Sequence, residues 1–141
     1  MSVVVKGLSS NMRKIKATVR TQAINGMKTS MKDLTRVASE AAPLDEGDLE
    51  MSGFNDVDVH GSEIKGWVGF EAFNKDFNYA IWTHEENYNL GTKSKAKGGG
   101  SGLSGTSYEV GKGYLIRPFK GEAKTYRGII KDDVKQGLSK L

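Results

Sequence analysis

The chain has 141 residues and a mass of 15.4 kDa, which suits one domain whose hydrophobic core needs no disulfide bonds. It contains no cysteine and only two histidines, which excludes a disulfide scaffold, a thiolate metal site and a cysteine nucleophile. The net charge of +4 is unevenly spread: residues 1–42 carry +6, residues 43–90 carry −9 and residues 91–141 carry +7. This segregation favours contacts between unlike protein surfaces at least as much as binding to a polyanion.

The sequence shows no membrane or secretion signal near its start. The apolar run of residues 3–5 is far shorter than the roughly 20 residues that cross a bilayer or the core of a signal peptide. We therefore expect a protein made in the cytoplasm, with no membrane partner.

Residues 9–42 have the spacing of a long amphipathic helix. Apolar side chains recur every three or four positions, from Met12 and Ile15 onward, and Pro43 ends the pattern because it excludes its predecessor from helical geometry. A helix of about 32 residues is about 50 Å long, which is long for so small a domain. Gly26 within it marks a bend or a close contact with another element.

The acidic middle of the chain predicts a turn followed by strands. Residues 43–52 have the composition of a turn, with Gly47 among acidic side chains. Phe54, Val57 and Val59 give a short, imperfect strand signal that Gly61 breaks, and residues 64–70 alternate as a two-sided strand, which together predict a hairpin. Residues 79–83 (YAIWT) are aromatic and favour β-structure, so we expect a third strand there.

The last third of the chain combines a biased segment with a second helix. Residues 91–107 are rich in glycine, serine and lysine, a composition that does not offset the entropy of ordering, so we expect a mobile loop. Residues 114–116 are a short apolar run that fits a last strand or an anchoring segment. From Pro118, a favourable first helical residue, the apolar pattern predicts an amphipathic helix to the C-terminus.

In chain order, these elements predict a single α+β domain over residues 1–141. It has a long N-terminal helix, a small antiparallel sheet of three to four strands, a mobile Gly/Lys-rich loop at about residues 91–107, and a C-terminal helix packed on the sheet. A small sheet with unpaired edges and an oversized helix are expected where neighbouring subunits complete the structure.

No residue pattern gives a strong catalytic or metal signal. His84 and Glu85 lack the HExxH spacing of a zinc site, and neighbours on a strand point to opposite faces, so a structural hydrogen-bonding role is favoured. The acidic residues around Gly47 lack the spacing of a calcium loop. We expect no enzymatic activity, no cofactor and no metal. The lysines of the Gly-rich loop could lie near DNA, although no nucleic-acid-binding motif accompanies them.

Three segments, in matching order, resemble one protein family. Residues 41–52 (AAPLDEGDLEMS) resemble the P-[VL]-D-T-G-x-L-x-x-S signature of small tailed-bacteriophage neck proteins, with Glu46 in place of the usual threonine. Residues 78–97 (NYAIWTHEENYNLGTKSKAK) are similar to the family's YAxxxHE strand and the YNLG..S..K that comes after it. Residues 110–119 (VGKGYLIRPF) look like the VGxxFLxRA lead into its C-terminal helix, with Pro118 where alanine is common.

The resemblance implies a non-enzymatic virion structural protein that forms a ring between the capsid portal and the tail tube. This is the role of head–tail joining or tail-completion proteins, also called minor capsid proteins. The implied partners are further copies of the chain and other neck, portal-adaptor and tail-tube proteins. A head-closure or tail-terminator subunit is an alternative in the same particle. A small basic DNA-binding accessory protein is an alternative from another class, and an enzyme is the least favoured.

The candidate interaction residues come from the acidic turn, the end of the predicted third strand and the basic loop. We expect acidic residues of the turn, or Glu85 and Glu86, to meet basic residues of a neighbouring subunit. The candidates are Asp45, Gly47, Asp48, Leu49, Tyr79, Trp82, His84, Glu85, Lys93, Lys95 and Lys97.

Overall fold

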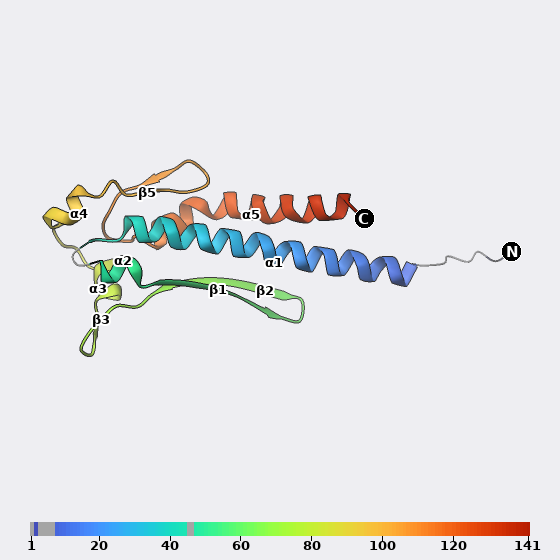
Figure 1. The fold of residues 1–141 in the computed structure, drawn as a ribbon, viewed down its shortest axis with the longest axis horizontal. Coiled ribbons are helices and arrows are strands. Elements are labelled where there is room, and N and C mark those ends of the chain that lie inside the picture. Colours follow the sequence, from blue (N-terminus) through green and yellow to red (C-terminus); the bar gives the residue numbers. More distant parts are fainter. Residues whose placement is uncertain (1, 3–7, 45–46) are drawn as a thin grey trace.

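A computed structural model of the chain describes residues 2, 8–44 and 47–141. Two long helices, α1 (Leu8–Ala41) and α5 (Ile116–Ser139), lie side by side (Figure 1). A hairpin of β1 (Gly53–His60) and β2 (Glu63–Phe70) covers the other flank of α1. The molecule is therefore elongated, and α1 lies between the hairpin and α5.

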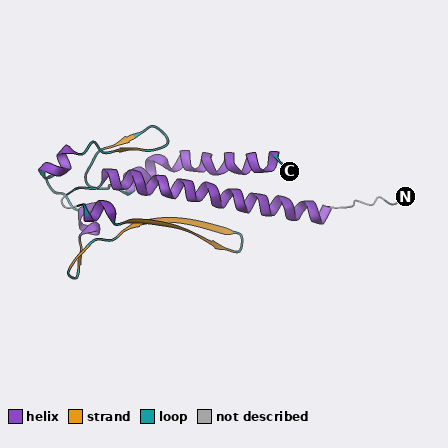
Figure 2. Cartoon of the chain, viewed as in Figure 1, coloured by secondary structure: helices purple, strands orange, loops and turns teal. Residues whose placement is uncertain are grey.

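The short elements gather around the C-terminal end of α1 (Figure 2). The strands of the described residues pair antiparallel in three separate two-stranded sheets, β1–β2, β3–β4 and β5–β6. The short elements are α2 (Asp48–Met51), β3 (Phe73–Asn74), β4 (Phe77–Asn78), α3 (Tyr79–Glu85), α4 (Thr92–Ala96), β5 (Gly100–Ser101) and β6 (Ser107–Tyr108).

The predicted α+β class is confirmed, with its long N-terminal helix, small antiparallel strand pairs and C-terminal helix. The strands form separate pairs and not one sheet. α5 packs mainly along α1 and meets the hairpin in a shared core cluster. In that cluster Val57 and Val68 of the hairpin pack against Met31, Leu34 and Tyr126.

The close contact predicted at Gly26 is confirmed. A Cβ at this position would lie 2.8 Å from the Ile130 Cα of α5, so the two backbones approach closely because glycine has no side chain. Pro118 lies in the first turn of α5, where a missing backbone N–H removes no helical hydrogen bond.

The strand predicted at residues 79–83 is wrong, because these residues form α3. The Asn78 side-chain oxygen accepts a hydrogen bond of 3.1 Å from the Ala80 N–H and caps the helix. The Thr83 hydroxyl donates to the Tyr79 carbonyl one turn earlier, at 2.6 Å. These local hydrogen bonds outweigh the weak β preference of the segment.

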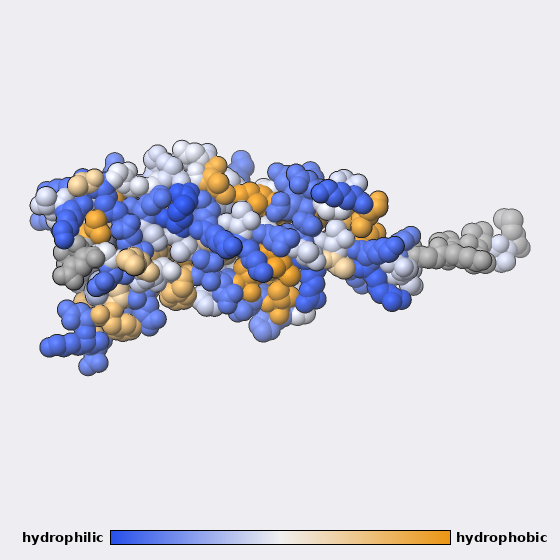
Figure 3. Space-filling view, viewed as in Figure 1, coloured by the Kyte–Doolittle hydropathy of each residue, from blue (hydrophilic) through white to orange (hydrophobic). Residues whose placement is uncertain are grey.

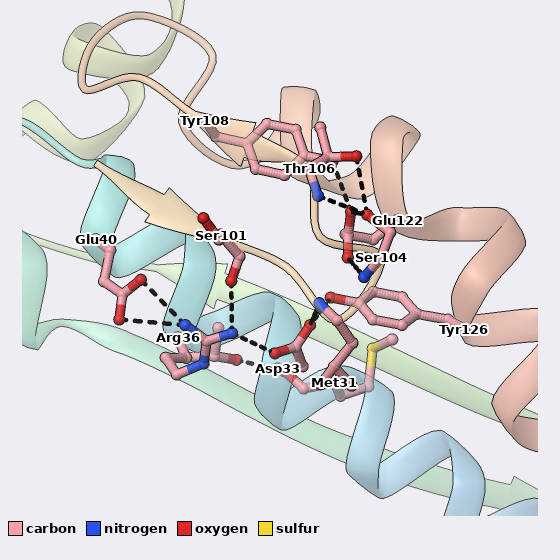
Figure 4. A network of polar contacts seen from close by, with 12 residues as sticks. Met31, Asp33, Arg36, Glu40, Ser101, Ser104, Thr106, Tyr108, Glu122 and Tyr126 are labelled. Atoms are coloured by element: carbon pink, nitrogen blue, oxygen red, sulfur yellow. Dashed lines mark hydrogen bonds and ion pairs between the residues drawn. The ribbon is translucent and has the colours of Figure 1, made fainter. Parts of the chain in front are cut away.

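The segment at residues 91–107, predicted to be a mobile loop, instead forms α4 and the β5–β6 hairpin. Two carboxylates hold the turn of this hairpin (Figure 4). Asp33 of α1 accepts from the Leu103 N–H at 3.2 Å. Glu122 of α5, which is fully buried, accepts from the Ser104 N–H at 2.9 Å and from the Ser104 hydroxyl. Charge-assisted hydrogen bonds of this kind offset the entropy lost on ordering.

Candidate functional site

The short elements at the C-terminal end of α1 surround an open groove of about 930 Å³. Its walls come from α2, the β3–β4 hairpin, α3 and the segment that follows α3. We call it the aromatic groove, after the rings that line it together with Asp48 and Leu49: Phe73, Phe77, Tyr79, Trp82 and Tyr88.

The rings of the aromatic groove are only partly covered. Trp82 and Tyr88 stack with ring centroids 5.3 Å apart and planes 23° apart. The Tyr88 hydroxyl donates to the Thr83 carbonyl, and burial raises the pKa of Tyr88. Phe73 and Phe77 are each 55% exposed. Exposed aromatic surface in a concave site is typical of protein–protein contacts.

Four of the sequence candidates meet at this groove. Asp48 and Leu49 come from α2, and Tyr79 and Trp82 come from α3. Leu49 is buried in the core behind the groove, so its contribution there is packing. Gly47 precedes α2 with a φ of +90°, a conformation that favours glycine. Asp45 and Glu46, the other predicted residues of the turn, lie outside the described residues.

His84 and Glu85 lie away from the aromatic groove, at the start of α5. The His84 Nε2 accepts from the Ile116 N–H at 3.1 Å, and its Nδ1 lies 2.8 Å from the Glu85 carboxylate. An accepting Nε2 assigns the proton to Nδ1, which donates to Glu85. His84 thereby satisfies a free N–H at the start of α5. The structural hydrogen-bonding role favoured from the sequence is confirmed.

Lys97 closes the C-terminal end of α1. Its ammonium group donates to the carbonyls of Ser39 at 3.1 Å and Ala42 at 2.7 Å, where a cation is favourable. It also lies 3.4 Å from the Glu50 carboxylate. The turn and the basic segment therefore pair within one chain at this position. Lys93 and Lys95 are exposed on α4 and do not line the groove.

The three segments that carry the family resemblance are bonded to one another at this end of the molecule. The Ser94 hydroxyl bonds to both backbone groups of Leu44, at 2.8 Å to the nitrogen and 3.1 Å to the oxygen. The Gly113 N–H donates to the His84 carbonyl at 2.9 Å. The Tyr114 hydroxyl donates to the Ala80 carbonyl at 2.7 Å. Residues far apart in the chain thus form one connected unit.

The sequence reasoning missed Phe73, Phe77 and Tyr88. The first two belong to residues 71–78, whose polar composition is typical of a loop, and the β3–β4 turn brings them to the groove wall. The sequence signal that could have identified them is the close spacing of the aromatic residues 73, 77 and 79 within a polar segment.

Within residues 8–44 and 47–141, no group of three histidine and carboxylate side chains could hold a metal ion. No helix of the described chain is long and apolar enough to span a bilayer. Comparison with protein-family models, curated proteins and solved structures gives no match to this chain. Function is therefore inferred from the residues and their arrangement.

Proposed function

We propose that this chain is a virion structural protein of a tailed bacteriophage, which assembles through protein–protein contacts into a homo-oligomeric ring at the head–tail interface. The proposed role is that of a neck, head–tail joining or tail-completion protein without enzymatic activity. The observation that carries the proposal is the hydrogen bonding between the three family-like segments, such as Ser94 to Leu44 and Gly113 to His84. If each short segment resembled the family only by chance, there would be no reason for the three segments to contact one another in the structure.

The exposed surface at the same end of the molecule supports an assembly role. Besides Phe73 and Phe77 of the groove, the helices that form its walls expose Met51 of α2 at 85% and Ile81 of α3 at 63%. Clustered exposed apolar side chains mark contact surfaces in small proteins. In addition, each strand of β1–β2 has one edge that pairs with no other strand of the described residues, and such edges are commonly covered by neighbours.

The ionisable groups of the aromatic groove favour binding over catalysis. Among the described residues that line it, Asp48 supplies the one carboxylate, and no histidine, lysine or arginine lies beside it. General acid–base chemistry needs a positioned donor and acceptor pair. A groove with many rings and few ionisable groups suits an apolar segment of a partner protein.

The test is a structural study of tailed particles produced from the genome that encodes this chain. We expect mass spectrometry to detect the chain in purified particles, and a reconstruction to place a ring of it between portal and tail tube. A ring at the head vertex or at the end of the tail tube would instead support the head-closure or tail-terminator alternative.

Absence of the chain from these particles would contradict the proposal. A DNA-binding accessory protein would then be supported if the isolated chain bound duplex DNA with an affinity that falls steeply as salt rises. An assembly protein shows little such binding.

A further inference from the structure

The apolar stripe of α1 changes its surroundings along the helix. Met31 and Leu34 are in the core at 7% and 2% exposure, whereas Met12 and Ile15 are 45% and 39% exposed. In Figure 1, α1 runs beyond both the tip of the β1–β2 hairpin and the end of α5. An amphipathic helix buries its apolar face against a partner. Within the described chain, the first turns of α1 have no such cover.

The C-terminal end of α5 extends this uncovered surface. Gly137 of α5 packs beside Thr18 and Gln22 of α1, and the nearby Leu138 and Leu141 are exposed. Figure 3 shows hydrophobic surface at this end of α5. The exposed apolar surface therefore belongs to two helices.

The same part of α1 carries only positive charge. Arg13, Lys16 and Arg20 flank the exposed stripe, and α1 has no acidic residue before Asp33. None of these three bases takes part in the ion pairs of the described residues. We call the surface of residues 12–20 of α1, with its exposed apolar side chains and the bases beside them, the basic stripe.

The outer face of the β1–β2 hairpin carries three carboxylates, Asp56, Asp58 and Glu63, and one lysine, Lys65, which pairs with Glu63. The face is therefore acidic on balance, and it has an apolar centre. Phe54 and Trp67 form an edge-to-face pair with centroids 5.8 Å apart, and both are more than 40% exposed. Asp56 and Asp58 alternate with Phe54 on the same face of β1, and Asp56 pairs with Trp67 across the hairpin.

The apolar surface of this face continues around Trp67. A groove of about 320 Å³ lies between β2 and the start of α5. Trp67 of β2, His84 of α3 and Ile116 and Phe119 of α5 line it, together with the buried Met31 and Leu34 of α1. Phe119 is 52% exposed. We call this groove and the outer hairpin face together the acidic face.

We propose that the basic stripe of one copy docks on the acidic face of a second copy. The apolar side chains of the stripe cover Phe54, Trp67 and the adjoining groove, and its bases meet Asp56 and Asp58. The two surfaces differ, so the contact is head to tail and each copy uses both surfaces. Head-to-tail contacts build a ring when the rotation between successive copies closes. This inference rests on the self-assembly in the proposed function and names the surfaces that perform it.

The apolar residues at the start of the basic stripe lie far along α1 from the acidic face of their own chain. Gly66 of β2 packs on Met27, and Ile15 precedes Met27 by about 18 Å along a continuous helix at 1.5 Å per residue. Asp56 and Asp58 also face away from α1, because Val57 between them packs on the Met31–Leu34 core and neighbours on a strand point to opposite sides of the sheet. The contact therefore requires a second copy.

A charge exchange tests the proposal. One variant reverses the stripe (Arg13→Glu, Lys16→Glu, Arg20→Glu) and another reverses the hairpin (Asp56→Lys, Asp58→Lys). Each alone places like charges in contact, so we expect self-association, measured by analytical ultracentrifugation, to weaken at least tenfold. Mixed in equal amounts, the two variants place opposite charges at every contact of an alternating ring, so association returns. Circular dichroism checks that both variants are folded.

The control variant is Lys124→Glu, Arg127→Glu, Lys131→Glu, which changes the same number of charges at the same spacing on exposed positions of α5. We expect it to associate like the wild type. If both reversals also associate like the wild type, or if mixing restores nothing, the docking is overturned while the particle test of function still stands. A wild-type chain that stays monomeric at every accessible concentration also overturns the docking.

The absence of cysteine from the chain allows a second test. Chains with Ile15→Cys are mixed with chains with Trp67→Cys under mild oxidation, and a disulfide forms only where Cα atoms come within about 7 Å. We expect cross-linked dimers from this pair, and few from Ile15→Cys with Leu103→Cys, an exposed position on the β5–β6 turn. Equal yields from the two pairs would contradict the proposal.

Discussion

Tyr126 of α5 donates a hydrogen bond of 2.8 Å to the Asp33 carboxylate of α1. The same carboxylate accepts from the Leu103 N–H at 3.2 Å and forms an ion pair of 2.6 Å with Arg36. Asp33 therefore joins the two long helices to the turn between β5 and β6 (Figure 4). Arg36 adds a hydrogen bond of 2.8 Å to the Ser101 carbonyl of β5, so α1 binds this hairpin at two points, in addition to the bonds from Glu122 of α5 to Ser104.

Replacing Tyr126 by phenylalanine removes one of these hydrogen bonds and leaves the ring in place. We expect Tyr126→Phe to lower the free energy of unfolding by about 1 to 2 kcal/mol, because a buried carboxylate loses a donor. Urea denaturation measures the change. A double-mutant cycle with Asp33→Asn isolates the pair, and a coupling energy of zero would show that the two residues act independently.

Alkaline pH should destabilise the fold through its buried tyrosines. Burial raises the pKa of Tyr108 to about 12, aided by its hydrogen bond to Glu122, and burial also raises the pKa of Tyr114 to about 12. The stability that each contributes is complete below the unfolded pKa of about 10 and is lost as pH rises from about 10 to about 12. The expected slope is about 1.4 kcal/mol per pH unit for each tyrosine.

Urea denaturation between pH 8 and pH 12, with tyrosinate absorbance recorded on the folded protein, measures this effect. A variant with Tyr114→Phe should show a shallower decline, because one titrating group is removed. A free energy of unfolding that stays constant above about pH 10 would contradict the expectation.

Two glycines near the β5–β6 hairpin should differ sharply in their tolerance of alanine. A Cβ at Gly102 would lie 1.9 Å from the Glu122 carboxylate oxygen, whereas a Cβ at Gly98 would have no atom within 4 Å. We expect Gly102→Ala to cost about 1 to 3 kcal/mol and to raise hydrogen exchange at residues 100–108. Gly98→Ala is the matched control and should change neither quantity. Equal effects at both positions would show that Glu122 does not hold the turn.

Replacing two helical glycines by alanine should change the stability of the protein in opposite directions. Gly128→Ala meets no atom within 4 Å and should stabilise α5 by up to about 1 kcal/mol, the difference in helix propensity. Gly26→Ala should destabilise the protein, because its Cβ meets the Ile130 backbone at 2.8 Å and forces the helices apart. Thermal unfolding of both variants gives the comparison, and a gain in stability at Gly26 would be inconsistent with the close crossing.

The two long helices and the β1–β2 hairpin were predictable because their patterns are local and repeat over many residues. The periodicity of α1 and the alternation of residues 64–70 each involve enough positions to outweigh single exceptions, and Gly61 separates this strand from the weaker signal before it. Residues 79–83 were wrongly predicted to be a strand because a pattern of five residues is too short to distinguish a strand from a helix. Asn78, one position before the segment, provides the cap that decides the outcome.

The order of the β5–β6 hairpin could not be read from its own composition. Asp33 and Glu122, which hold it, lie 70 and 18 residues from their partners in the turn. The aromatic groove was partly predictable for a related reason: motif residues Asp48, Tyr79 and Trp82 were found from the sequence. Phe73 and Phe77 reach the groove only through a short turn in a polar segment.

Helix α1 connects the basic stripe to the aromatic groove without a hinge. Gly26 is the only glycine within it and no proline interrupts it, and Ile130 of α5 is packed against that glycine. The position that would otherwise bend most easily is therefore braced. In the proposed ring, a tilt imposed on the first turns of α1 by a neighbouring copy must move the groove end as well. Adjacent subunits of such a ring would therefore change their orientation together and not independently.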